Sequence, residues 1–161
     1  MKKIIGLIIV TAVLLLAGCA QPSAPITGEE TPPPPELYDK VWISPAEVDV
    51  GNFFAGARAE WPVRIHNGND QPTKFSVTYS KPSTTAEGFV TAPNEAQDWV
   101  IIADATPVLA PKADKDVLIA VEMPKGATAP EKWEFLIVVK DITQTGMVQT
   151  ELACRWLVTM R

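Results

Sequence analysis

The feature that most constrains how this chain folds is a series of short apolar runs between residues 41 and 161, separated by turn residues every eight to twelve positions. Apolar and polar residues alternate within the runs, which places successive side chains on opposite faces of a β-strand. No run has a sustained period of 3.6 residues, and most of the 15 prolines fall between runs, so we expect little helix. This spacing is typical of a β-sandwich.

The runs predict an antiparallel sandwich of about seven to eight strands. Half-buried strands without intervening helices need a second sheet to cover their apolar face. Three tryptophans are in phase with apolar neighbours and are expected in the core: Trp61, Trp133 and Trp156. The predicted strands cover residues 41–44, 47–50, 59–66, 74–80, 99–103, 116–122, 133–140 and 150–160.

The first part of this domain carries a recognisable order of residues. Ile43-Ser44-Pro45 comes first, then residues 48–51 ending in glycine, then Gly56, and then a strand that ends in Asn67. This order resembles the opening of immunoglobulin-like domains of the Hydin and major sperm protein type. The resemblance implies an immunoglobulin-like sandwich, an interaction or scaffold role, and no shared active site. The cysteine pair of antibody domains is absent.

The N-terminus has the layout of a signal peptide. Lys2 and Lys3 precede an apolar run at residues 4–17, which is shorter than the roughly 20 residues of a membrane-spanning helix. The run ends in Leu16-Ala17-Gly18-Cys19, which resembles the lipobox of bacterial and some archaeal lipoproteins. That resemblance implies a diacylglyceryl group on Cys19 and cleavage before it. An ordinary signal peptide and a transmembrane anchor are the alternatives.

Residues 20–40 form a predicted stalk. They contain six prolines, four of them consecutive at residues 32–35, and few residues to bury. Such a segment reaches roughly 25 Å as a flexible coil and about 65 Å as an extended polyproline II helix. The predicted organisation is therefore a cleaved signal peptide at 1–18, a lipidated cysteine and disordered stalk at 19–40, and one domain at 41–161.

Charge and cysteine content exclude several classes of protein. Without Lys2 and Lys3, the chain has 12 basic and 19 acidic residues, a formal net charge of −7. This charge argues against nucleic-acid binding, which requires neutralisation of phosphates. With Cys19 lipidated, Cys154 is the one remaining thiol, so an internal disulfide cannot form and the fold depends on its core.

The residues that could carry chemistry are few. His66, the single histidine, lies at a predicted strand end and is expected to be structural. Cys154 lies mid-strand and is expected to be a buried, unreactive thiol. The Asn67, Asn69 and Asp70 group and the pair of Asp114 with Asp116 do not have the spacing of a calcium loop and are expected to be solvated turns. We therefore predict no enzyme activity, no metal and no cofactor.

Aromatic residues provide the candidate binding surface. Trp42 and Trp99 are not clearly in phase with the core, and partial burial at a sheet edge is the alternative to exposure for both. Phe53 and Phe54 cannot both point inward on one strand, so one is exposed or the pair lies in a loop. The long segment at residues 81–98, rich in small and polar residues, is a candidate recognition loop.

These observations favour a lipid-anchored interaction or scaffold module outside the cytoplasm. It would be held at the outer face of the cytoplasmic membrane or at the outer membrane, and its partner would be another cell-envelope protein. The alternative is a module that binds envelope polysaccharide or a small ligand through exposed aromatic residues. A hydrolase whose site is not visible in the sequence is the third possibility.

Overall fold

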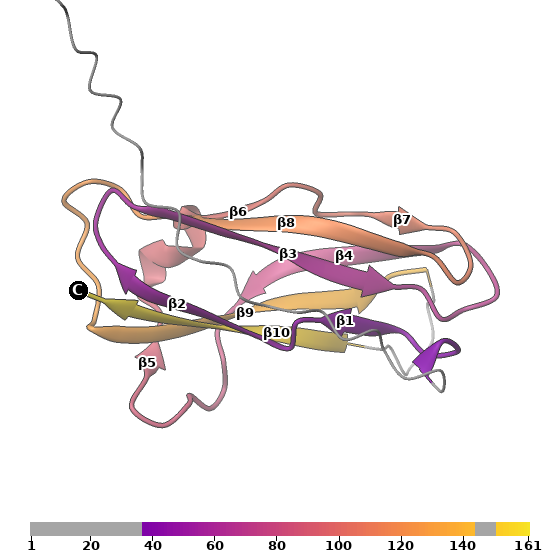
Figure 1. The fold of residues 1–161 in the computed structure, drawn as a ribbon, viewed down its shortest axis with the longest axis horizontal. Helices are drawn as coiled ribbons and strands as arrows, with labels where there is room; N and C mark the ends of the chain where they lie inside the picture. The colour runs from indigo at the N-terminus through magenta and orange to yellow at the C-terminus, as the bar shows by residue number, and fades with distance from the viewer. Residues whose placement is uncertain (1–36, 144–150) are drawn as a thin grey trace, which may run out of the picture. The chain divides into compact units, whose positions relative to one another are not determined.

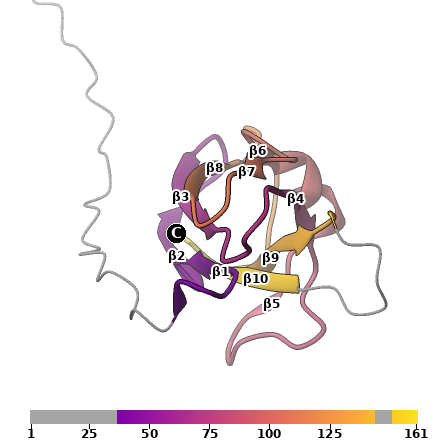
Figure 2. The same ribbon diagram turned by 90° about the vertical axis from the view of Figure 1, so that its right-hand side faces the viewer.

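The computed structural model describes residues 37–143 and 151–161. They form a domain of two β-sheets that face one another (Figures 1 and 2). Sheet A has the order β1-β3-β8-β6, formed by Trp42–Ser44, Arg58–His66, Asp114–Glu122 and Val100–Ile102. Sheet B has the order β2-β10-β9-β4-β7, formed by Glu47–Phe53, Glu151–Met160, Lys132–Asp141, Thr73–Ser80 and Val108–Leu109, and β5 (Val90–Thr91) also pairs with β9.

The predicted all-β sandwich with little helix is confirmed, and the structure adds detail to the strand pattern. β2 continues past Gly51 to Phe53, because β10 pairs with it as far as the Met160–Phe53 position. Trp99 ends a short 3-10 helix (Asn94–Trp99) instead of beginning β6. The two-residue strands β5 and β7 were not predicted, because two residues are too few to show a period.

At both edges of the sandwich the chain crosses from one sheet to the other. β1 pairs with β3 in sheet A, and after Pro45 the chain enters sheet B, where β2 runs parallel to β10. At the opposite edge, β6 pairs with β8 in sheet A, and β7 then pairs with β4 in sheet B. Each edge is therefore shared between the sheets, and Figure 1 shows β6 and β7 following one another along one edge.

The core lies between the sheets and follows the predicted alternation. In sheet A, Val63 is opposite Val117 in register, and both are buried. In sheet B, Trp156 is opposite Phe135, and their rings stack with centroids 5.5 Å apart. Packed aromatic pairs of this kind add about 0.5–1.5 kcal/mol each beyond the area that they bury. Burial of apolar surface in this packing stabilises the fold.

The predicted core tryptophans differ in burial. Trp133 and Trp156 are fully buried, as expected. Trp61 is in phase with Val63 but is only partly buried, and it packs at the margin of the core. Cys154 is buried beside Trp156 on β10, which confirms the prediction of a buried thiol.

Candidate interaction surface

Two of the four predicted surface aromatics are not at the surface. Trp99 is 7% exposed and packs edge-on against Trp133, with ring centroids 6.1 Å apart. Phe53 is 3% exposed, at the end of β2. The prediction of an exposed surface is therefore wrong for Trp99, whereas the burial of Phe53 agrees with the prediction that the two phenylalanines do not both point inward. In the case of Trp99, the 3-10 helix turns the indole inward before β6 begins.

The other two aromatics are partly accessible. Phe54 is 43% exposed, which confirms that one member of the Phe53-Phe54 pair points outward. The guanidinium of Arg161 lies 4.3 Å from the centre of its ring. Trp42 on β1 is partly buried and stacks on His66, with ring centroids 5.0 Å apart and planes 8° from parallel. A residue that already stacks on a protein ring has less free surface for a ligand.

The segment at 81–98 is fastened to sheet B. The side chain of Glu134 on β9 is fully buried and accepts a hydrogen bond of 2.8 Å from the backbone N–H of Ala86. The backbone carbonyl of Glu134 accepts another from the N–H of Ala92, 2.9 Å long. Arg155 lies 3.8 Å from the second carboxylate oxygen, Oε1, which has no hydrogen-bond partner within the described residues. The predicted recognition loop is thus held by an acidic side chain beneath it.

The outer face of sheet A carries an apolar stripe that the sequence did not reveal. The stripe has four members in two pairs. Pro62 on β3 is opposite Leu118 on β8, and Ala120, two residues further along β8, is opposite Ile101 on β6. Leu118 is 40% exposed and Ile101 is 45% exposed, whereas Ala120 is covered by its neighbours. The alternating residues of β8, such as Val117 and Ile119, point into the core.

Ion pairs border the apolar stripe on both sides along the strands. On one side, Arg58 contacts Glu60 at 3.1 Å and Glu122 at 2.8 Å. On the other side, Arg64 contacts Asp116 with two hydrogen bonds of 2.8 and 3.2 Å. All of these groups are substantially exposed, so the pairs add little to stability. The stripe is therefore an apolar centre with a charged border.

A groove of about 450 Å³ adjoins the stripe at Ile101. Trp99, Met123 and Pro124 contribute apolar lining, and Asp98 and Glu122 contribute acidic groups. The stripe and the groove meet at Ile101, which belongs to both. We call the stripe and this groove the sheet A surface.

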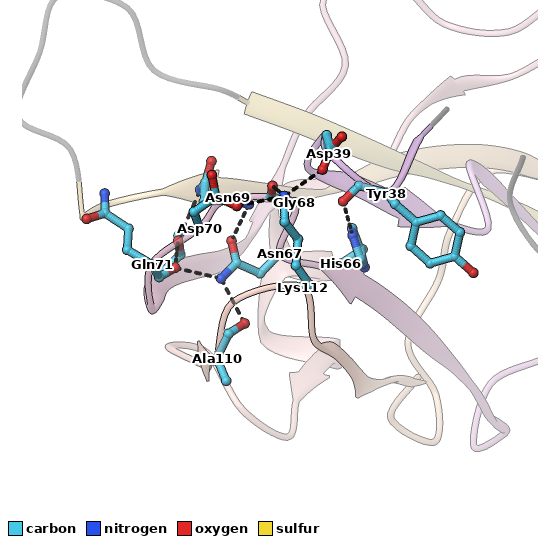
Figure 3. Close-up of polar contacts among 11 residues, drawn as sticks. Tyr38, Asp39, His66, Asn67, Gly68, Asn69, Asp70, Gln71, Ala110 and Lys112 are labelled. Carbon is cyan, nitrogen blue, oxygen red and sulfur yellow. Dashed lines mark hydrogen bonds and ion pairs between the residues drawn. The ribbon is translucent and has the colours of Figure 1, made fainter. Parts of the chain in front are cut away.

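One end of the sandwich is held by a polar network centred on Asn67 (Figure 3). The buried side-chain amide of Asn67 donates to the carbonyls of Gln71, Leu109 and Ala110, at 3.0, 3.2 and 2.9 Å. Its side-chain oxygen accepts from the backbone N–H of Asn69 at 3.1 Å. Asn67 therefore ties the β3–β4 turn to the β7–β8 turn, and the expectation that it is solvated is wrong. Asp70, whose side chain is 94% exposed, is solvated as predicted.

The same end binds the residues that lead into β1. Lys112 donates to Asp39 at 2.7 Å and to the carbonyl of Gly68 at 2.6 Å, and it pairs with Asp70 at 3.1 Å. The ammonium of Lys112 lowers the pKa of Asp39 below its ordinary value. Gly68 packs so closely on the backbone of Lys40 that a Cβ at this position would clash with it.

His66 is buried at this end, between Trp42 and the two partners of its ring. One ring nitrogen, Nδ1, lies 2.5 Å from a carboxylate oxygen of Asp114. The other, Nε2, lies 2.9 Å from the backbone carbonyl of Tyr38 (Figure 3). With its ring 1% exposed, His66 is a structural residue, as the sequence predicted.

The described residues contain little that could act on a substrate. Burial raises the pKa of the Cys154 thiol to about 12, which leaves it protonated and non-nucleophilic near neutral pH. No group of three or more metal-ligating side chains is found in residues 37–143 and 151–161. In the same residues we find no helix that is long and apolar enough to cross a membrane. Cys19 and its neighbours Leu16, Ala17 and Gly18 lie outside the described residues.

No protein-family model matches this chain, and no curated protein matches it in sequence. Similar solved structures do exist. The ASH/PapD-like domain 7 of human CEP192 has a TM-score of 0.56 and 14% identity, over 86% of this chain and 94% of that one. The class 5 fimbriae chaperone CfaA has a TM-score of 0.51 and 17% identity, over 76% of this chain and 57% of that one.

A third similar structure comes from a complex. It is a chain of the CsuC–CsuE chaperone–tip adhesion subunit pre-assembly complex of the Csu pili of Acinetobacter baumannii, with a TM-score of 0.50 and 8% identity. The match covers 76% of this chain and 52% of that one, so this chain spans little more than half of each chaperone structure. At these identities the likeness shows the fold alone, which is an immunoglobulin-like β-sandwich.

Proposed function

We propose that this chain is a lipid-anchored protein-interaction module of a cell envelope, with no catalytic activity of its own. The sandwich resembles domains that are described as chaperones, one of them from a complex with an adhesion subunit. That likeness supports a protein-interaction role at the level of the fold. The lipid on Cys19 and the envelope location are inferred from the lipobox-like sequence.

The observation that carries the proposal is the sheet A surface. Interfaces between proteins typically have an apolar centre and a polar rim. Leu118 and Ile101 supply exposed apolar area at the centre, and the ion pairs of Arg58 and Arg64 supply the rim. We infer that the partner is an envelope protein with a matching apolar patch, which docks against this face.

The anchor strengthens the interaction without adding contacts. Two molecules attached to one membrane meet at a higher effective concentration than two free molecules. A weak interface of modest area can therefore suffice, provided that the stalk at residues 20–40 lets the domain reach its partner.

Crosslinking in cells tests the proposal. A photo-crosslinking amino acid is placed at Leu118 in the full chain, and captured proteins are identified by mass spectrometry. The matched control places it at Thr78, which is exposed on sheet B. We expect one dominant partner from position 118, none from position 78, and loss of capture when Cys19→Ser removes the anchor. Equal capture from both positions would contradict the proposal.

Polysaccharide binding is less well supported. Of the four aromatic residues considered for it, Trp99 and Phe53 are buried, Trp42 stacks on His66, and Phe54 contacts Arg161. If envelope sugars change the tryptophan fluorescence of the chain, and the Trp42→Phe variant loses this response, the polysaccharide hypothesis replaces the one proposed here.

A further inference from the structure

The residues that lead into the domain are held against the sandwich by a small number of contacts. The carbonyl of Tyr38 lies 2.9 Å from His66 Nε2, and Asp39 accepts a hydrogen bond of 2.7 Å from Lys112. Lys40 packs on Gly68. These contacts involve different side chains, and the one made by His66 depends on its protonation state.

The number of N–H groups on the ring of His66 explains why its contacts depend on protonation. Both of its neighbours, the carboxylate of Asp114 and the carbonyl of Tyr38, can only accept hydrogen bonds. A neutral imidazole has one N–H, so it can donate to one of them while the other faces a lone pair. The imidazolium has two N–H groups and satisfies both contacts. An imidazolium is therefore the form of the ring that can donate at both of these contacts.

The surroundings of His66 also suit a cation. The carboxylate of Asp114 supplies a compensating negative charge, which a buried cation requires. The face of Trp42, parallel to the ring at 5.0 Å, is favourable to positive charge. Tyr38 contributes its ring edge at 6.0 Å.

Two basic groups on neighbouring elements are paired with other acids. Lys112, from the β7–β8 turn, contacts Asp39 and Asp70. On β3, Arg64 contacts Asp116. Asp114 is thus the charged group that directly faces the imidazole.

We propose that His66 is a proton-dependent latch that fastens residues 37 and 38 to the sandwich, whereas Lys112 holds Asp39 independently of this proton. When the ring loses a proton, the remaining N–H stays with Asp114, because a hydrogen bond to a carboxylate is stronger than one to a carbonyl. Nε2 then presents a lone pair to the carbonyl oxygen of Tyr38, and the contact becomes repulsive. The latch is therefore closed at low pH and opens as the pH rises.

Opening would change the reach of the tether. Because Asp39 stays paired with Lys112, opening releases residues 37 and 38, and two residues of extended chain add at most about 7 Å between the sandwich and whatever precedes residue 37. The latch does not depend on the sheet A surface or on the nature of the partner. It would let the pH outside the cell set how far the domain can move from its point of attachment.

The experiment follows the single histidine and the residues that it holds. In the full chain in detergent micelles, the ring nitrogens of His66 and the carbonyl carbon of Tyr38 are followed by NMR from pH 5 to 9, the range in which histidines ordinarily change charge. Hydrogen exchange of the Lys40 amide, which bonds to the carbonyl of Leu37, is measured in parallel and corrected for its intrinsic pH dependence.

We expect both ring nitrogens to be protonated at low pH, and the Tyr38 carbonyl to change with the same midpoint as the ring. Lys40 exchange should increase about tenfold or more with the loss of a hydrogen bond to a charged group. The Asn67 amide, which bonds to Ala113, is the control and should not change. A Tyr38 signal that stays constant while His66 titrates, or a His66 ring that does not titrate over this range, would overturn the proposal.

Two variants distinguish opening of the latch from a general destabilisation of the domain. His66→Gln should make Lys40 exchange independent of pH. Asp114→Asn keeps an acceptor for Nδ1 but removes the negative charge, so the latch should open at lower pH. If His66→Gln does not fold, Asp114→Asn carries the test, and an unchanged midpoint of opening in that variant contradicts the proposal.

Discussion

At the scale of single residues, Asn67 shows how one buried side chain can define the end of a domain. Its buried amide donates to three backbone carbonyls, of which that of Leu109 is buried and would otherwise lack this donor. The sequence marked Asn67 as the last residue of a strand in an immunoglobulin-like pattern, but it did not show why an asparagine is needed. The reason is the β7–β8 turn, which is more than 40 residues away in the chain.

Removing this side chain should be costly. We expect Asn67→Ala to lower the free energy of unfolding by about 2–4 kcal/mol, because three hydrogen bonds are lost at once, one of them to the buried carbonyl of Leu109. Urea denaturation of the full chain measures the change. Asp70→Ala, three residues along the same turn, removes an exposed side chain and should cost less than about 1 kcal/mol. Equal costs for the two variants would contradict the role assigned to Asn67.

The reactivity of Cys154 is a second prediction at this scale. Because its thiol is buried and its pKa is raised to about 12, the reactive thiolate is scarce at pH 8. In a Cys19→Ser background, a thiol reagent should label the native chain very slowly and the denatured chain quickly. Rapid labelling of the folded chain would show that Cys154 is accessible, contrary to its position on β10.

At the scale of elements, the sequence predicted the long strands, in which apolar and polar residues alternate. The periods of β3, β8, β9 and β10 predicted their existence and their inward faces, because side chains on a strand alternate strictly between two sides. The apolar stripe was missed for a related reason. Leu118 lies in the polar phase of β8. Pro62 and Ile101 lie near it only because β3 and β6 pair with β8, and the sequence does not show which strands pair.

Strand β10 offers a test of the predicted phase. We expect Trp156→Ala to lower the free energy of unfolding by about 3–5 kcal/mol, since the indole is fully buried against Phe135. Trp61→Ala on β3 should cost clearly less, because that side chain is only partly buried. Chemical denaturation of both variants in parallel provides the comparison, and a Trp156→Ala midpoint close to that of the wild type would contradict the core packing.

The position of the segment at 81–98 depends on the side chain of Glu134 in sheet B. Glu134→Ala removes the acceptor of the Ala86 N–H, so we expect faster hydrogen exchange at Ala86 and faster proteolysis within 82–90. The amide of Ala92 bonds to the backbone of residue 134 and should be much less affected. Exchange measured by mass spectrometry or NMR distinguishes the two. A uniform increase across the domain would instead indicate global destabilisation.

At the scale of the whole molecule, the proposed parts have separate tasks. The lipid and the stalk would set where the domain is and how far it reaches, and the His66 latch would adjust that reach. The sheet A surface would choose the partner. This separation predicts that binding can be abolished without loss of stability, because Leu118 and Ile101 contribute exposed area and lie outside the core.

The double variant Leu118→Glu/Ile101→Glu tests this separation. Two charges at the centre of the apolar stripe would have to be desolvated on docking, so capture of the partner should fall at least tenfold. The unfolding free energy should stay within about 1 kcal/mol of the wild type, because surface substitutions rarely cost more than about 0.5 kcal/mol each. Thr78→Glu, which adds a charge on the outer face of sheet B, should leave both quantities unchanged. Undiminished capture by a stable double variant would mean that the partner docks elsewhere, and the end of the sandwich around Trp42 and Tyr38 would be the next surface to examine.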